Sequence, residues 1–345
     1  MHRVPDVGAS PGLQRRLVQA GIVLLGLVGI VGSGGGGSLG FPDLSCLNDG
    51  SCPGGWTPPP QAYAELGPGR VTTQVGGTVV FNVNSTVIEP AYRWCRAPAG
   101  DNPCAEIVGA TDATYTLAAA NLGDDGATFR VTVSGTNGTA WAASRLAVSS
   151  MPGVTYQDGE FLDSEWTATT ATVPAENGPT VSISRAATGG HPGAFRTAAY
   201  TFPVTSSSVQ VVYSGGSAVY DPAVQGAIYL IDFGEDCINS ASSNLLSYTA
   251  PMIEQAGRRF VAAKSARYCV ATTWTAVRRS SLGTEDFELA GGPACSTGES
   301  CPDFSGSGAP IHVGLVGGAE LSGGLVPPVR TGHGFDNWKV TVWRR

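Results

Sequence analysis

The sequence lacks the clusters of lysine and arginine with which proteins bind a phosphate backbone. Charged residues make up only 14% of the 345 residues, and the formal net charge is -7. Beyond the N-terminal segment, no long stretch has apolar residues recurring at helical spacing. With 48 glycines and 23 prolines, the chain instead shows short alternating runs separated by turn residues. The composition therefore argues against nucleic acid as a partner, and we expect an all-β fold.

Motifs of common catalytic chemistry are also missing. There is no metalloprotease histidine pair, no P-loop lysine, no Gly-x-Ser-x-Gly nucleophile turn and no strand-linked dinucleotide fingerprint. Glu160, Asp163 and Glu165 form the best candidate cluster for glycoside hydrolysis, which needs two carboxyl groups aimed into one cleft. Because side chains alternate along a strand, Glu160 would point away from the other two. We expect a solvated strand and turn here, and we assign no catalytic residue.

The N-terminal segment determines the predicted compartment. Arginines precede an apolar stretch from Leu17 to Val31, and small residues follow it, which is the pattern of a bacterial export signal. The stretch is about 15 residues long, short of the roughly 20 that span a bilayer, which favours cleavage over a retained anchor. We therefore expect residues 1–32 to be an export signal or N-terminal anchor of a periplasmic, cell-surface or extracellular protein. Membrane contact would involve only residues 17–31, if the signal is uncleaved.

All eight cysteines follow that segment. An oxidising compartment favours disulfides, and the spacing does not match a tetrahedral zinc site. Short loops close at the least entropic cost, so pairing between sequence neighbours is the leading hypothesis, although the sequence leaves other connectivities open. The predicted pairs are Cys46 with Cys52, Cys95 with Cys104, Cys237 with Cys269, and Cys295 with Cys301.

The chain is also longer than one hydrophobic core usually organises, which predicts more than one folded unit. Residues 33–60 are rich in glycine and proline, a composition typical of a tether rather than a packed core. We expect one domain over 61–150 and a second over 151–345.

Alternating residues in the first of these domains predict strands with one apolar face. The inward positions are Val79, Phe81 and Val83 in one strand, and Phe129, Val131 and Val133 in another. Trp94 is the natural core residue between two sheets. Together with the Asp-x-Gly-Ala-x-Phe run from Asp124, these features resemble the immunoglobulin-like modules of bacterial secreted proteins.

This resemblance implies how the first domain is held together. Val83 and Val131 stand where the family has its two inter-sheet cysteines, so the sheets are expected to cohere by apolar packing alone. Cys95 and Cys104 would instead staple the loop or hairpin that follows the strand containing Trp94.

The C-terminal domain opens with Asp158-Gly-Glu-Phe161 and closes with Gly334-Phe-Asp-Asn-Trp338. These motifs resemble those of concanavalin A-like or laminin-G-like jelly rolls in bacterial extracellular proteins. The resemblance implies a larger antiparallel jelly-roll sandwich in which the first and last strands pair as neighbours.

Candidate ligand sites in this domain each have a plainer explanation. Asp232, Glu235 and Asp236 follow the apolar run from Ala227 to Ile231 and could supply oxygen ligands to Ca²⁺. A tight disulfide-bound turn before Cys237 explains the same residues, so we expect a turn and no cofactor. The candidate ligand-binding residues, each of which burial or a turn also explains, are Trp166, Tyr220, Trp274, Asp336, Asn337 and Trp338.

The predicted function follows from these features and from the family resemblance, because a fold alone does not fix function. We expect an exported, non-catalytic protein of binding or adhesion type, in which the immunoglobulin-like domain is a spacer. The C-terminal sandwich would bind carbohydrate or a cell-surface protein. A secreted polysaccharide-degrading enzyme and a structural component of the cell envelope are the alternatives.

Overall fold

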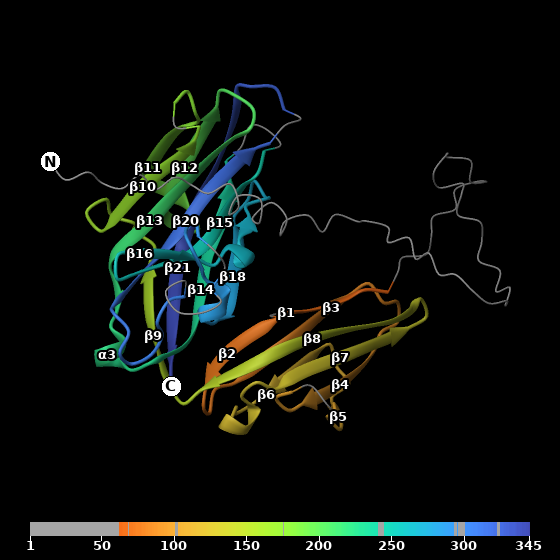
Figure 1. Ribbon diagram of the computed structural model, residues 1–345. Helices are drawn as coiled ribbons and strands as arrows, with labels where there is room; N and C mark the ends of the chain where they lie inside the picture. The colour runs from red at the N-terminus through yellow and green to blue at the C-terminus, as the bar shows by residue number, and fades with distance from the viewer. Residues whose placement is uncertain are drawn as a thin grey trace, which may run out of the picture.

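The computed structural model describes residues 62–345 except 68, 101–102, 175, 241–244, 293–294, 296–300 and 323–324. The predicted export signal or anchor, the tether and the Cys46–Cys52 pair therefore lie outside the described residues. Strands dominate the described part of the chain and form two sandwiches, which confirms the all-β prediction (Figure 1).

The first sandwich is immunoglobulin-like and has one sheet of three strands and one of five. The smaller sheet has the order β1 (Ala64–Gly67), β3 (Val79–Ser85) and β6 (Thr114–Leu117). The larger has the order β2 (Arg70–Gln74), β8 (Gly138–Ser149), β7 (Thr128–Gly135), β4 (Ala91–Ala97) and β5 (Ala105–Glu106). β2 runs parallel to β8, which places the first strand of this sheet beside the last.

Aromatic side chains fill the space between these two sheets. Trp94 is 1% exposed, and its indole Nε1 donates a hydrogen bond to the carbonyl of Asp112 at 2.8 Å. The Phe81 ring lies 4.7 Å from that of Phe129 and 6.4 Å from that of Trp94, measured between centroids. The two predicted apolar faces and the buried tryptophan are thus confirmed.

The second sandwich is built from two larger sheets. One has the order β10 (Trp166–Val173), β13 (Ser207–Tyr220), β20 (Ile311–Leu321), β15 (Ser247–Gln255), β16 (Arg258–Val261) and β19 (Glu288–Leu289), with β17 (Arg267–Tyr268) also on β15. The other has the order β11 (Thr180–Gly190), β12 (Gly193–Phe202), β21 (Val329–Arg344), β14 (Ile228–Asn239) and β18 (Thr275–Leu282), with β9 (Met151–Asp158) also on β21. We call this last one the β21 sheet. The α-helix of this sandwich, α3, spans only Pro222–Gln225, and no described helix is long and apolar enough to cross a membrane.

The last strand, β21, organises its sheet. One edge pairs with β14, whereas the other pairs first with β12 and then, after Asp336, with β9. The partner changes where Asn337 takes a φ of 49°, in the left-handed region. The predicted pairing of the first and last strands of this segment is confirmed, with Trp338 opposite Asp158.

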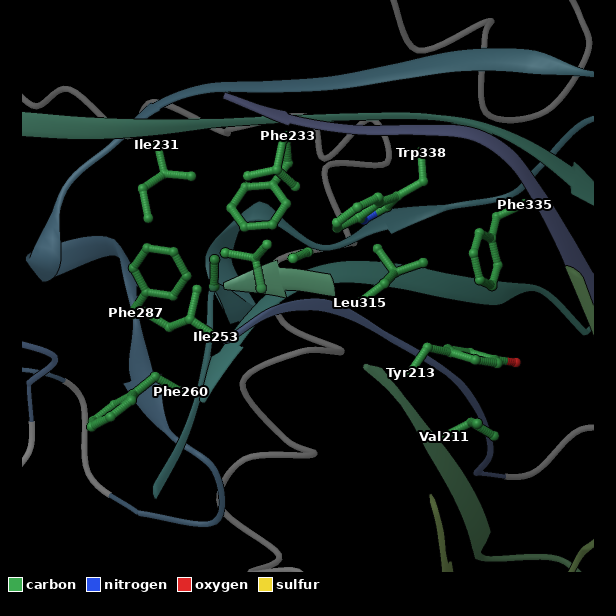
Figure 2. Packing of buried hydrophobic residues seen from close by; sticks show 14 of the residues in the cluster. Val211, Tyr213, Ile231, Phe233, Ile253, Phe260, Phe287, Leu315, Phe335 and Trp338 are labelled. Atoms are coloured by element: carbon green, nitrogen blue, oxygen red, sulfur yellow. The ribbon is translucent and has the colours of Figure 1, made fainter. Parts of the chain in front are cut away.

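The core of the second sandwich is a layer of aromatic and branched side chains from both sheets. Figure 2 shows Phe335 and Trp338 of β21 on one side of this layer, and Tyr213 and Leu315 of the opposite sheet on the other. The Tyr213 and Phe335 rings meet edge to face at 4.9 Å between centroids. Apolar burial of this extent is the main stabilising contribution.

Three disulfides join sequence neighbours, which are the predicted pairs that fall within the described residues. They are Cys95–Cys104, Cys237–Cys269 and Cys295–Cys301. The first links β4 to the start of the β5 hairpin, as predicted, since Cys95 lies opposite Glu106. The second joins β14 of the β21 sheet to the segment after β17 of the opposite sheet. Three such bonds are consistent with an exported protein, because disulfides persist in oxidising compartments.

The two sandwiches contact each other directly. β8 ends at Ser149 and β9 begins at Met151, so a single residue connects the last strand of one sandwich to the first strand of the other. The hydroxyl of Thr72 lies 2.7 Å from that of Ser281, and the guanidinium of Arg70 lies 3.3 Å from the Asp286 carboxylate. Side chains of β2 therefore meet β18 and the turn that follows it.

The buried histidine of the core makes stability depend on pH. His333 is 0% exposed and packs against Gly317, where a Cβ would lie 2.3 Å from the imidazole Cε1. Burial lowers the pKa of His333 to about 4 from 6.5. Below pH 6.5 the unfolded chain therefore binds a proton that the folded protein does not, and stability falls as the pH drops toward 4.

We expect His333 to account for a loss of about 2 kcal/mol of unfolding free energy between pH 7 and pH 5. In denaturant titrations at the two pH values, His333→Gln should flatten the pH dependence by that amount. His312→Gln, which changes an exposed histidine, should leave it unaltered. Equal pH dependence in wild type and His333→Gln would contradict the assignment.

Candidate functional site

A groove of about 900 Å³ runs across four adjacent strands of the β21 sheet. These strands are β9, β21, β14 and β18, in that order in space. Because side chains alternate along each strand, the apolar ones enter the core and the polar ones between them point outward into the groove. The lining residues are Gln157, Asp158, Gly159, Asp232, Phe233, Gly234, Arg278, Ser280, Asn337, Trp338, Lys339, Thr341 and Trp343.

One row of paired residues crosses the middle of the groove. Gln157 pairs with Lys339, Lys339 with Gly234, and Gly234 with Arg278. The Arg278 side chain lies across Gly234, where a Cβ would come within 2.9 Å of the arginine Cδ. Its Nη1 donates to the Glu235 carbonyl at 2.9 Å, which holds the guanidinium on the sheet while the side chain stays 56% exposed. The row thus presents an amide and two cations.

Trp343 is the groove's partly exposed aromatic residue, and Asp232 holds it in place. The indole Nε1 donates to Asp232 Oδ2 at 2.8 Å, and the ring packs against Gly153, where a Cβ would lie 3.1 Å from it. The other carboxylate oxygen accepts from the Ser281 amide at 2.6 Å and from the Thr72 hydroxyl at 3.4 Å. Thr72 belongs to the first sandwich, which therefore helps to hold the Asp232 side chain in position.

Burial raises the pKa of Asp232, and the hydrogen bonds from Ser281, Trp343 and Thr72 oppose that shift only in part. The raised pKa means that the loss of solvation on burial, which disfavours the ionised carboxylate, outweighs the hydrogen bonds that favour it.

A hydrogen-bond network closes the other end of the groove. Asn337 Nδ2 donates to Asp236 Oδ2 at 2.8 Å and to the His191 carbonyl. The Asp336 carboxylate accepts from the amide of Asn337 at 2.6 Å and from that of His191. His191 Nδ1 lies 3.0 Å from Asp236 Oδ2. These contacts connect the turn between β11 and β12 to residues 336–337 of β21, where the paired strand changes from β12 to β9.

The six candidate ligand-binding residues fall in different environments. Trp166, Tyr220 and Trp338 are at most 4% exposed and belong to the core, although Trp338 also borders the groove. Trp274 donates from Nε1 to the Gly189 carbonyl at 3.1 Å. Asp336 is fully buried in the network above, whereas Asn337 is exposed and lines the groove. The structure thus brings only Asn337 and Trp338 to the groove.

The acidic cluster near the start of the second sandwich lies in the turn between β9 and β10. The Glu160 side chain is 75% exposed and lies 3.2 Å from Arg185, and that of Asp163 is 74% exposed and lies 2.8 Å from Arg196. The two carboxylates are thus paired with separate arginines at the surface.

The predicted turn at Asp232, Glu235 and Asp236 is wrong. β14 continues through all three residues to Asn239, and its register shifts near Gly234. The strand persists because each carboxylate finds its own donors: Asp232 contacts Trp343, Glu235 contacts Arg279, and Asp236 contacts Asn337. In the described part of the chain, no three His, Cys, Asp or Glu side chains are grouped to hold a metal ion.

Trp343, Lys339, Arg278 and Gln157 were not indicated as site residues by the sequence. One signal was available for two of them: Lys339, Thr341 and Trp343 alternate with Val340 and Val342, which marks the first three as the outward face of the last strand. Arg278 and Gln157 could not be placed beside them, because strand register across a sheet is a long-range property.

Comparison with known proteins gives no family. No protein-family model matches the chain, and no curated protein matches its sequence. Among solved structures, the N-terminal four Ig domains of Dscam1 isoform 6.9 match with 18% identity and a TM-score of 0.21, covering 26% of this chain and 21% of that one. Isoform 7.44 matches with 19% identity and the same TM-score of 0.21 and the same shares, 26% and 21%. This chain thus spans about a fifth of the length of these structures. Fold and groove define the class: a disulfide-bonded, all-β protein with an immunoglobulin-like sandwich followed by a larger antiparallel sandwich.

Proposed function

We propose that the protein is an exported, non-catalytic binding protein of the bacterial cell surface, and that its groove on the β21 sheet binds carbohydrate. The second sandwich would be a concanavalin A-like jelly roll, and the first a spacer that presents it. The observation that carries the proposal is the fixed, partly exposed Trp343 ring in a groove that also holds Gln157, Lys339 and Arg278. An aromatic face can stack on a sugar ring while the amide and the cations bind its hydroxyl groups.

The carboxylates of the groove support binding over hydrolysis. Asp158 accepts from the amides of Glu160 and Phe161 on Oδ1, at 2.7 and 3.0 Å, and from Trp166 Nε1 on Oδ2, at 2.5 Å. Both oxygens of Asp232 are occupied in the same way, as described above. A hydrolase needs two carboxyl groups free to act on the bond between two sugars, and both of these are engaged in holding the site.

A glycan array followed by titration calorimetry with the best-bound oligosaccharide tests this proposal. We expect Trp343→Ala to weaken binding by at least about tenfold, which is the scale of one lost anchor residue. The sequence offers a matched pair of controls, because its two lysines are Lys339 in the groove and Lys264 outside it. Lys339→Ala should weaken binding and Lys264→Ala should not.

Chromatography of the oligosaccharide after incubation completes the experiment. We expect it to be recovered intact. Absence of any bound glycan, equal affinity in wild type and Trp343→Ala, or a shortened product would each overturn the proposal.

A further inference from the structure

The outer face of the five-stranded sheet in the first sandwich carries an exposed tryptophan among arginines. Trp141 of β8 is 64% exposed, and the Arg130 guanidinium lies 5.2 Å from the centre of its ring. The neighbours of Trp141 along the strand, Ala140 and Ala142, pack into the core, so Trp141 points outward. Arg130 lies between the buried residues Phe129 and Val131 and shares that face.

Two more arginines stand on the same face. Trp141 pairs with Thr132, and Thr132 pairs with Arg93, so Arg93 lies two strands from Trp141 in one row. Neighbouring strands are separated by about 4.8 Å, which places Arg93 within about 10 Å of Trp141. Arg145 lies on β8 itself, opposite Thr128. We call Arg93, Arg130, Trp141 and Arg145 the Trp141 strip.

The charge of this strip is not balanced by the protein. Among the residues that the structure describes, no ion pair involves Arg93, Arg130 or Arg145, although the protein carries a net charge of -7. Glu106 lies on the same face beside Cys95, two residues along β4 from Arg93, but no ion pair joins Glu106 to Arg93 or Arg130 among the described residues. Arginine is a weakly hydrated cation whose planar group binds a carboxylate through two hydrogen bonds.

We propose that the Trp141 strip is a second binding surface, independent of the groove, and that it takes an acidic polysaccharide carrying carboxylates. The indole would stack on the apolar face of a sugar ring, and the guanidinium groups would bind the uronate carboxylates of that ring and its neighbours. A flat sheet face suits an extended polymer, and the positive charge complements a polyanion. The site requires no contribution from Trp343 or Arg278.

Binding of the 345-residue chain to polygalacturonate, measured at low salt and again at 0.5 M NaCl, tests this inference. We expect Trp141→Ala and the double change Arg93→Gln with Arg130→Gln to weaken binding at least tenfold, and high salt to weaken it further. Arg93 and Trp141 are exposed and Arg130 is partly buried on the outer face of the sheet, so unfolding midpoints should stay close to wild type. Neutral dextran should not bind through this surface.

Matched variants separate this inference from the proposed function. Lys264→Gln removes one exposed positive charge elsewhere and should leave binding unchanged, as should Trp343→Ala in the groove. No binding of wild type to polygalacturonate, equal loss in Lys264→Gln, or tighter binding of oligo-dT with the same sensitivity to Trp141→Ala would overturn it. If Trp343→Ala instead abolishes binding, the acidic polymer occupies the groove and the Trp141 strip is not a site.

Discussion

Replacing Arg279 with methionine is expected to destabilise the second sandwich by about 3–5 kcal/mol. Arg279 is 3% exposed and Glu235 is 0% exposed, and Nη1 of the arginine lies 2.5 and 2.6 Å from the two carboxylate oxygens. The arginine also donates to the Thr249 carbonyl at 2.8 Å and to the Ser265 carbonyl at 2.9 Å. The pair therefore links both sheets, and removing the arginine leaves a buried carboxylate without its counter-charge.

The neighbouring residue supplies the control for this prediction. Arg278 precedes Arg279 on the same strand but faces the groove, so Arg278→Met should cost less than about 1 kcal/mol. The double variant Glu235→Leu with Arg279→Met removes both charges and should be more stable than Arg279→Met alone, because no unpaired charge remains. Denaturant unfolding of the three variants measures these differences. A cost below about 1 kcal/mol for Arg279→Met would contradict the inferred role of the pair.

Removing the Cys237–Cys269 disulfide by a double alanine substitution is expected to cost about 3–4 kcal/mol of unfolding free energy. The bond closes a loop with a sequence separation of 32, and a longer loop leaves the unfolded chain more entropy to lose. It also joins strand β14 to the opposite sheet. Both cysteines are buried, with Cys237 2% exposed and Cys269 3% exposed.

The disulfide of the first sandwich, which closes a shorter loop, provides the comparison. Cys95–Cys104 has a sequence separation of 9, for which the same loop-entropy relation gives about 2–3 kcal/mol. Denaturant titrations of both double-alanine variants under non-reducing conditions test the order of the two effects. A larger cost for the Cys95–Cys104 variant would contradict the entropic account.

Local sequence patterns were sufficient to predict the fold class and the first sandwich. Alternation identified the inward faces of β3 and β7, and Trp94 identified the core between the sheets, because both depend on residues close in sequence. The pairing of β9 with β21 was also predicted, but only through the resemblance of their aromatic motifs to a known family.

The groove could not be predicted in the same way. The three acidic residues around Gly234 were interpreted as a tight turn because Cys237 follows them directly. Charged side chains are buried in a strand only when each has a partner. The partners are Trp343, Arg279 and Asn337, which lie 44 to 111 residues away in sequence. Trp343 was not among the predicted site residues. Its side chain lines the groove because it lies on the outward face of β21, and its ring packs against Gly153, which has no side chain to displace it.

The most direct test of the binding account is a crystal structure of the protein with the oligosaccharide that the array selects. We expect an intact saccharide lying along the groove, with a sugar ring on the Trp343 indole and hydroxyl groups bound to Gln157, Lys339 or Arg278. A cleaved saccharide in the groove, or a saccharide bound elsewhere with the groove empty, would contradict the account.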